Sequence, residues 1–148
     1  MAPADDNLYQ QVLLDHARNP RHFGEHSDAT LQSEGFNRLC GDRVTVYLEV
    51  DGDLIKKASF SGESCAICKG SASIMMEALQ GQSLEAIEKL IVSFAKFQDD
   101  WLISDERMKP FEALVAVKSY PTRMKCLNLP WKALEAAIKG GDVEVSTE

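Results

Sequence analysis

The strongest constraint on the fold is a pair of alternating segments joined by a tight turn. In "RVTVYLEV" apolar residues recur at every second position, which is typical of a strand with one buried face. Asp51-Gly52 follows and is a strong signal for a hairpin turn. "LIKKASF" then predicts the returning strand, with Leu54, Ala58 and Phe60 on its buried face. The stretch therefore predicts an antiparallel β-hairpin.

This hairpin brings two cysteine-containing segments together. Cys40-Gly41-Asp42 leads into the first strand, and Cys65 lies just beyond the end of the second. The outer ends of two antiparallel strands meet at one edge of the hairpin. We therefore expect Cys40 and Cys65 to be neighbours in space although they are distant in the sequence.

Helical spacing of apolar residues dominates most of the remaining chain. It predicts helices over residues 8–17, 70–80, 84–97 and 110–119, a turn at Pro121, and a last helix between Pro130 and Gly140. A polar loop is expected over 98–109 and a short edge strand over 29–32. We expect residues 1–148 to form a single domain whose last residues, about 140–148, are a flexible tail. The fold class is α+β, with a three-stranded antiparallel sheet and about five to six helices.

Composition narrows the compartment and the partners. The net charge of −7 argues against a nucleic-acid partner, because binding phosphates needs a basic face. No apolar run reaches the length of a membrane span, and "MAPADDNLYQ" lacks the features of a signal peptide. We therefore expect a cytoplasmic protein. Thiols stay reduced in that compartment, so four cysteines indicate metal or sulfur chemistry more than disulfides.

Two sets of metal ligands are compatible with the cysteine spacing. One set is Cys40, Cys65, Cys68 and Cys126, and the other replaces Cys68 by Asp42. Thiolate-rich sets favour zinc or an iron–sulfur cluster. A dithiol redox pair at Cys65 and Cys68 is disfavoured, because the preceding strands form a hairpin and not a βαβ unit. Cations flank Cys126 at Arg123 and Lys125, which favours its thiolate.

The histidines add little to the candidate chemistry, and two serines are not expected to be nucleophiles. The three histidines lie in the N-terminal part of the chain, where "DHARNPRHFG" is typical of a polar surface. Ser71 and Ser73 are expected at the start of a helix.

Three motifs, in order along the chain, resemble those of the U-type iron–sulfur assembly proteins, which include IscU, SufU and the N-terminal domain of NifU. "LYQQVLLDHARNPRHFG" resembles the family's opening motif, and "CGDRV" resembles its C-G-D motif. "FSGESCAICKGSASIMMEAL" resembles its third motif, with Gly70 where the family has alanine. The resemblance covers nearly the whole chain and implies a SufE/NifU-like fold. Lys125 in place of histidine, together with a longer stretch between Gly81 and Cys126, resembles the SufU type.

The resemblance implies a zinc ion held by Cys40, Asp42, Cys65 and Cys126. It also implies a sulfur acceptor for a SufS-type cysteine desulfurase, one of whose histidines would replace a thiolate on zinc and free Cys40. Downstream partners would be a SUF scaffold or apo iron–sulfur proteins. Arg123 is our own candidate for a supporting charge in that exchange.

Two alternatives remain beside the sulfurtransferase. One is a scaffold that assembles a transient [2Fe–2S] cluster on the same four residues, and the other is a structural zinc-binding interaction module. Two departures from the family pattern also stand out. Arg38 occupies the position of a usual proline, and Cys68 replaces a serine or another small residue, which keeps it as an alternative ligand.

Overall fold

The computed structural model describes residues 3–103, 106–140 and 144–146. The elements in chain order are α1 (Pro3–Arg18), β1 (Leu31–Asn37), β2 (Asp42–Asp51), β3 (Leu54–Ser61), α2 (Ala66–Leu79), α3 (Leu84–Asp100), the 3-10 segments η1 (Glu106–Ser119) and η2 (Pro121–Arg123), α4 (Met124–Lys139) and β4 (Glu144–Ser146). The α+β class is confirmed. None of the helices in the described residues is long and apolar enough to cross a membrane.

The predicted hairpin forms the middle of the sheet. β2 pairs with β3 in antiparallel fashion, and the strand order is β3-β2-β1-β4. Val44, Val46 and Leu48 are buried as predicted. A register shift between Glu49 and Val50 changes the start of β3, so Ile55 is buried and Leu54 is exposed.

The strand count and the fate of the tail were predicted incorrectly. The sheet has four strands instead of three, because β4 pairs in parallel with β1. Three residues of the tail that we expected to be flexible, 144–146, thus belong to the sheet, whereas 141–143 and 147–148 lie outside the described residues. The edge strand expected over 29–32 is β1, which is longer and begins at Leu31.

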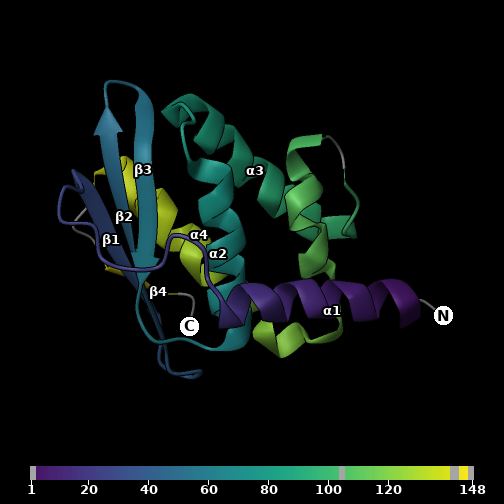
Figure 1. Ribbon diagram of the computed structural model, residues 1–148. Helices are drawn as coiled ribbons and strands as arrows, with labels where there is room; N and C mark the ends of the chain where they lie inside the picture. The colour runs from purple at the N-terminus through teal and green to yellow at the C-terminus, as the bar shows by residue number, and fades with distance from the viewer. Residues whose placement is uncertain (1–2, 104–105, 141–143, 147–148) are drawn as a thin grey trace.

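The helices cover one face of the sheet and extend beyond it (Figure 1). α4 lies against β1 and β2, α2 packs on β3 and α4, and α1 crosses α2 near its start. Two hydrogen bonds fix α4 to α2, because Ser71 Oγ donates to the Leu127 carbonyl at 2.9 Å and accepts from Trp131 Nε1 at 3.2 Å. Ser71 therefore holds the N-terminal half of α4 in place.

The ends of the later helices also differ from the prediction. α4 begins at Met124 and runs through Pro130, which we expected to open it. α3 extends to Asp100, and η1 occupies part of the expected loop from Glu106 onward. The early start of α4 places Cys126 in its first turn.

Candidate metal centre

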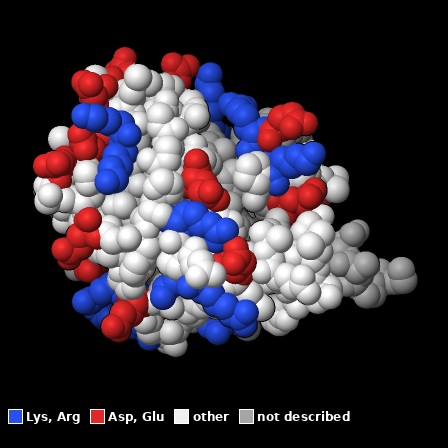
Figure 2. Space-filling model, viewed as in Figure 1, with Lys and Arg blue, Asp and Glu red and all other residues white. Residues whose placement is uncertain are grey.

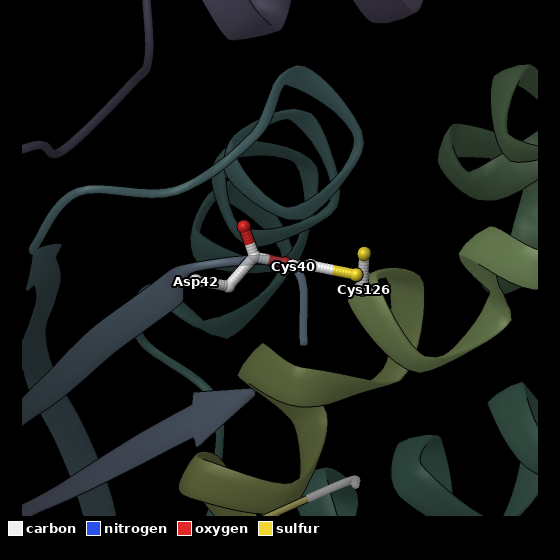
Figure 3. Close-up of side chains that lie close together, drawn as sticks. All are labelled: Cys40, Asp42 and Cys126. Carbon is white, nitrogen blue, oxygen red and sulfur yellow. The ribbon is translucent and has the colours of Figure 1, made fainter. Parts of the chain in front are cut away.

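Three potential ligand side chains converge at the end of the sheet where β2 begins, which is its lower end in Figure 1. One atom each from Cys40, Asp42 and Cys126 lies within 4.8 Å of the other two. We call these three residues the thiol cluster. Figure 3 shows Cys40 and Asp42 approaching from the start of β2 and Cys126 from the first turn of α4. Asp42 and Cys126 are buried, at 2% and 0% exposure, and Cys40 is half-buried.

The β1–β2 connection bends through Gly41 to place two of these residues. Gly41 has φ of +74°, a left-handed conformation that glycine adopts without strain. Cys40 and Asp42 on either side of it can then turn toward the same point. The expected proximity of the two outer hairpin ends is confirmed, because Arg43 N donates to the Glu63 carbonyl at 2.8 Å.

Cys65 lies beside the thiol cluster but outside its mutual contacts. Its backbone N–H donates to Asp42 Oδ1 at 2.7 Å, and its Sγ lies 3.7 Å from Asp42 Oδ2. Cys65 is also the N-cap of α2, since its Sγ accepts from the Cys68 N–H at 3.5 Å. Of the four ligands implied by the family, three are thus brought together and the fourth is adjacent.

Cys126 lies in an electropositive setting at the start of α4. A neighbouring cation favours a thiolate, and Arg123 Nη1 lies 3.9 Å from Cys126 Sγ. Burial nevertheless raises the pKa of the Cys126 thiol, and hydrogen bonds with Asp42 and Cys40 raise it further. The Arg123 pKa is raised in turn, first by the charge of Cys65 and then by hydrogen bonding with Cys40. Arg123 therefore faces three of the four cysteines.

The donor set fits a single soft or borderline cation. Thiolates bound tetrahedrally to zinc at about 2.3 Å lie roughly 3.8 Å apart, and the ligand atoms of the thiol cluster all lie within 4.8 Å of one another, which is close enough for one shared ion. A buried carboxylate and buried thiols are costly to ionise without a counter-charge. A divalent cation supplies that charge, and mixed sulfur and oxygen ligands favour zinc or iron over magnesium or calcium.

Cys68 is a core residue. Its exposure is 0%, and burial raises the pKa of its thiol well above the usual range. Its side chain is not in the thiol cluster, although its backbone N–H touches Cys65 Sγ. The prediction that Cys68 is a small buried residue is confirmed.

The expectation for the N-terminal histidines was wrong for His16. It is buried at 8% exposure, its Nδ1 lies 2.7 Å from Ser73 Oγ, and its Nε2 lies 3.7 Å from Glu77. Ser73 Oγ also accepts the Arg21 N–H at 2.8 Å. These contacts join α1 and the segment after it to α2. The only signal in the sequence was the position of His16 within the first motif.

His26 was missed in a second way. With Asp28 and Glu49 it forms a group of potential ligand atoms that lie within 4.8 Å of one another. Nothing local in the sequence indicates this group, because Glu49 joins it only through the fold.

Comparison with known proteins places these residues in a family. The NifU-like N-terminal domain family matches residues 8–142 of the chain. The iron–sulfur cluster assembly scaffold protein IscU of Thermotoga maritima is 36% identical over 132 residues, which cover 89% of this chain and 93% of that protein. The zinc-dependent sulfurtransferase SufU of Bacillus subtilis is 37% identical over 138 residues, covering 90% of each.

The fold is shared with solved structures as well. A putative iron–sulfur cluster assembly scaffold protein for the SUF system from Fervidobacterium islandicum superimposes with a TM-score of 0.77 at 33% identity. That superposition covers 86% of this chain and 94% of the other.

Proposed function

This chain belongs to the NifU-like N-terminal domain family, and we propose that it serves iron–sulfur cluster assembly as a zinc-dependent sulfur acceptor. Its donor is a cysteine desulfurase of the SufS type, and Cys40 is the accepting thiol. The metal ligands are Cys40, Asp42, Cys65 and Cys126. The 37% identical SufU of Bacillus subtilis supports this reading, because it is named a zinc-dependent sulfurtransferase.

The observation that carries the proposal is the thiol cluster itself. Cys40, Asp42 and Cys126 come from two distant parts of the chain and still lie within 4.8 Å of one another. Cys40 is the more exposed of the two cluster thiols, since Cys126 has 0% exposure. An incoming sulfur donor therefore meets Cys40 first.

The transfer step balances without an added oxidant or reductant. The Cys40 thiolate attacks the outer sulfur of the donor's cysteine persulfide, and a new S–S bond forms. The old S–S bond breaks, and its electron pair leaves with the donor's cysteine thiolate. Cys40 then carries the persulfide, including the proton of the transferred sulfur.

This chain's own residues keep Cys40 reactive and in position. Zinc, when bound, holds its thiol ligands deprotonated at neutral pH. Asp42 would supply the oxygen ligand, and the Cys65 N–H holds its carboxylate in place. Arg123 provides a positive charge beside Cys126 and hydrogen-bonds with Cys40, which stabilises a free thiolate at either residue. The free state of all four cysteines suits the reducing cytoplasm, where we place the activity.

The test is a reaction of the purified protein with cysteine and a SufS-type desulfurase. We expect faster alanine release and a persulfide on Cys40, detected by mass spectrometry of the digested protein. Cys40→Ser should abolish both effects. Cys68→Ser is the matched control, because it removes a thiol outside the cluster. Equal turnover with and without the protein, and no persulfide on Cys40, would refute the proposed role.

A scaffold role on the same residues is the second candidate. It is supported by the 36% identical relative from Thermotoga maritima, which is named a scaffold protein. Here ferrous iron and sulfide are substrates, and a [2Fe–2S] cluster would form on the thiol cluster and Cys65. Anaerobic incubation with iron, cysteine and the desulfurase distinguishes the two roles. If the eluted protein absorbs visible light as a bound cluster does, the scaffold role is favoured. If the eluted protein is colourless and carries a persulfide, the acceptor role is favoured.

A further inference from the structure

A polar pocket opens beside the thiol cluster. Its volume is about 330 Å³. It is lined by residues in and beside the β1–β2 connection, namely Phe36, Asn37, Arg38, Gly41, Asp42 and Arg43. Asp42 lines both the pocket and the thiol cluster. The pocket and the thiol cluster therefore share Asp42 as a common wall.

Positive charge is concentrated around this pocket in a chain whose net charge is −7. Arg38 and Arg43 line it, and Arg123 lies at the neighbouring cysteines. Figure 2 shows several blue side chains, with red ones among them, over the lower part of the molecule, the end at which the β1–β2 connection lies in Figure 1. The pocket is thus a local exception to an acidic protein.

The two arginines are held so that a ligand can meet them. The Arg38 guanidinium lies 5.0 Å from the centre of the Phe36 ring, a cation–π contact that limits its motion. Arg43 Nε lies 3.5 Å from Glu34 in an exposed pair, and such pairs contribute little to stability. An incoming anion can therefore compete with Glu34 for Arg43.

Asn37 adds a hydrogen-bond donor to the same lining. Its side chain is fully buried, and its Oδ1 accepts the Leu39 N–H at 3.1 Å. Its Nδ2 has no acceptor among the described residues. Buried donors are almost always paired, so this amide indicates a missing acceptor. The Asp42 carboxylate does not accept from this amide, because its Oδ1 accepts from the Cys65 N–H and its Oδ2 faces Cys65 Sγ.

We propose that this pocket binds a carboxylate, and that its source is an acidic side chain of the sulfur donor, seated there while the donor's persulfide reaches Cys40. Planar carboxylates match the fork of donors on an arginine. A polyphosphate partner is disfavoured because the rest of the surface is acidic. The choice of source rests on the proposed function. A free small carboxylate is the other source of the same chemistry.

The first arm of the test uses the donor protein. We expect Arg38→Ala/Arg43→Ala to raise the concentration needed for half-maximal stimulation of the desulfurase by about tenfold, since a lost charged contact across an interface costs at least that much. Lys89→Ala/Lys139→Ala removes the same charge from exposed positions on α3 and α4, and should leave half-saturation unchanged. Zinc content is measured for both variants, because a purely structural effect would lower it.

The second arm needs no sulfur transfer. It therefore tests carboxylate binding in the pocket even if the proposed function is wrong. Sodium succinate is titrated into the ¹⁵N-labelled protein at constant ionic strength, with inorganic phosphate as the comparison. We expect succinate to shift the amide signals of Gly41 and Arg43 in a saturable way, and Arg38→Ala/Arg43→Ala to lose that shift.

The two arms together separate the outcomes. If the concentration for half-maximal stimulation rises only in Arg38→Ala/Arg43→Ala, the donor is the source of the carboxylate. If succinate shifts the amide signals but that concentration does not rise, the source is a free small carboxylate. Equal shifts with phosphate, or an equal rise in both double variants, would overturn the assignment. Absence of both effects would overturn it as well.

Discussion

The two ends of the sheet each hold a group of potential metal ligands, and the groups differ in how their charges are satisfied. At the lower end, the thiol cluster combines two thiols and a buried carboxylate. At the hairpin end, His26, Asp28 and Glu49 are equally close together, and we call them the hairpin-end cluster. Proximity alone therefore does not distinguish them.

Their partners do. Glu49 Oε1 lies 2.6 Å from His26 Nε2, and its Oε2 lies 3.4 Å from Lys56 Nζ. Both carboxylate oxygens of Glu49 in the hairpin-end cluster thus already have a partner, and a metal would compete with Lys56 for one of them. In the thiol cluster the Asp42 carboxylate accepts from a backbone N–H, and Arg123 is one cation shared among the surrounding cysteines. Buried acidic groups that outnumber their cationic partners are therefore a stronger reason to expect a metal at the thiol cluster than at the hairpin-end cluster.

The largest expected effect separates the clusters by metal content. Asp42→Ala removes the oxygen ligand at the lower end, and Asp28→Ala removes its counterpart at the hairpin end. We expect Asp42→Ala to lower zinc affinity on the order of 100-fold, since even outer partners of ligands are worth 10- to 100-fold. Asp28→Ala should bind zinc as the wild type does. Competition with a chromogenic chelator measures both.

The ligand set itself is open to the same measurement. If Cys68→Ser loses zinc while Asp42→Ala retains it, the ligands are the four cysteines and our assignment is wrong. A loss of zinc in Asp28→Ala would instead contradict the distinction between the two clusters.

A second contrast concerns two glycines with positive φ, one at each end. Gly62 has φ of +126° and a Cβ built there would lie 2.2 Å from the Arg43 carbonyl oxygen. Gly52 has φ of +64° and open space around that position. Alanine at either site pays about 1–2 kcal/mol for the left-handed backbone. Gly62→Ala must also push β3 away from β2, for about 1–3 kcal/mol more. Urea unfolding compares the two variants, and equal losses would mean that the lower end is not tightly packed.

The sequence predicts what is local and misses what is not. The hairpin was predicted because its apolar residues alternate and an Asp-Gly turn joins them. β1 also alternates in burial, but its buried positions are Ser33, Gly35 and Asn37, so no apolar pattern appears. β4 is short and forms only by pairing with β1, so nothing in its own composition predicts it.

The residues of the candidate site also divide into those that a local pattern predicts and those that depend on the whole fold. Cys40, Asp42 and Cys65 follow from the hairpin, because its outer ends must meet. Cys126 is in both ligand sets that the cysteines allow, but no local pattern places it, since its position depends on α4 continuing through Pro130 and packing on Ser71. The family resemblance implies the choice of Asp42 over Cys68. Pro130 by itself predicts a helix start. Packing of the buried Leu127 and Trp131 overrides the local preference.

A smaller effect tests whether Cys68 belongs to the core or to the site. Cys68→Ser places a hydroxyl at a position with 0% exposure, so we expect a loss of about 1–3 kcal/mol in the free energy of unfolding. Cys68→Ala removes the sulfur without adding a polar group and should cost less. Both variants should retain zinc and persulfide formation. A variant that stays stable but loses zinc would move Cys68 into the ligand set.

The smallest expected effect lies at the hairpin end and depends on pH. The hydrogen bond from His26 lowers the pKa of Glu49 below its usual value of 4.5, and Lys56 lowers it further. The folded state therefore binds this proton more weakly than the unfolded state. The stabilisation is present above about pH 4.5 and is lost as the pH falls through the folded value. Glu49→Gln should lower Tm slightly at pH 6, and the difference from wild type should shrink toward pH 3. Glu85→Gln, in an exposed pair with Lys89, is the control and should show a smaller difference. A difference for Glu49→Gln that stays constant with pH would mean that its carboxylate charge does not stabilise the hairpin end.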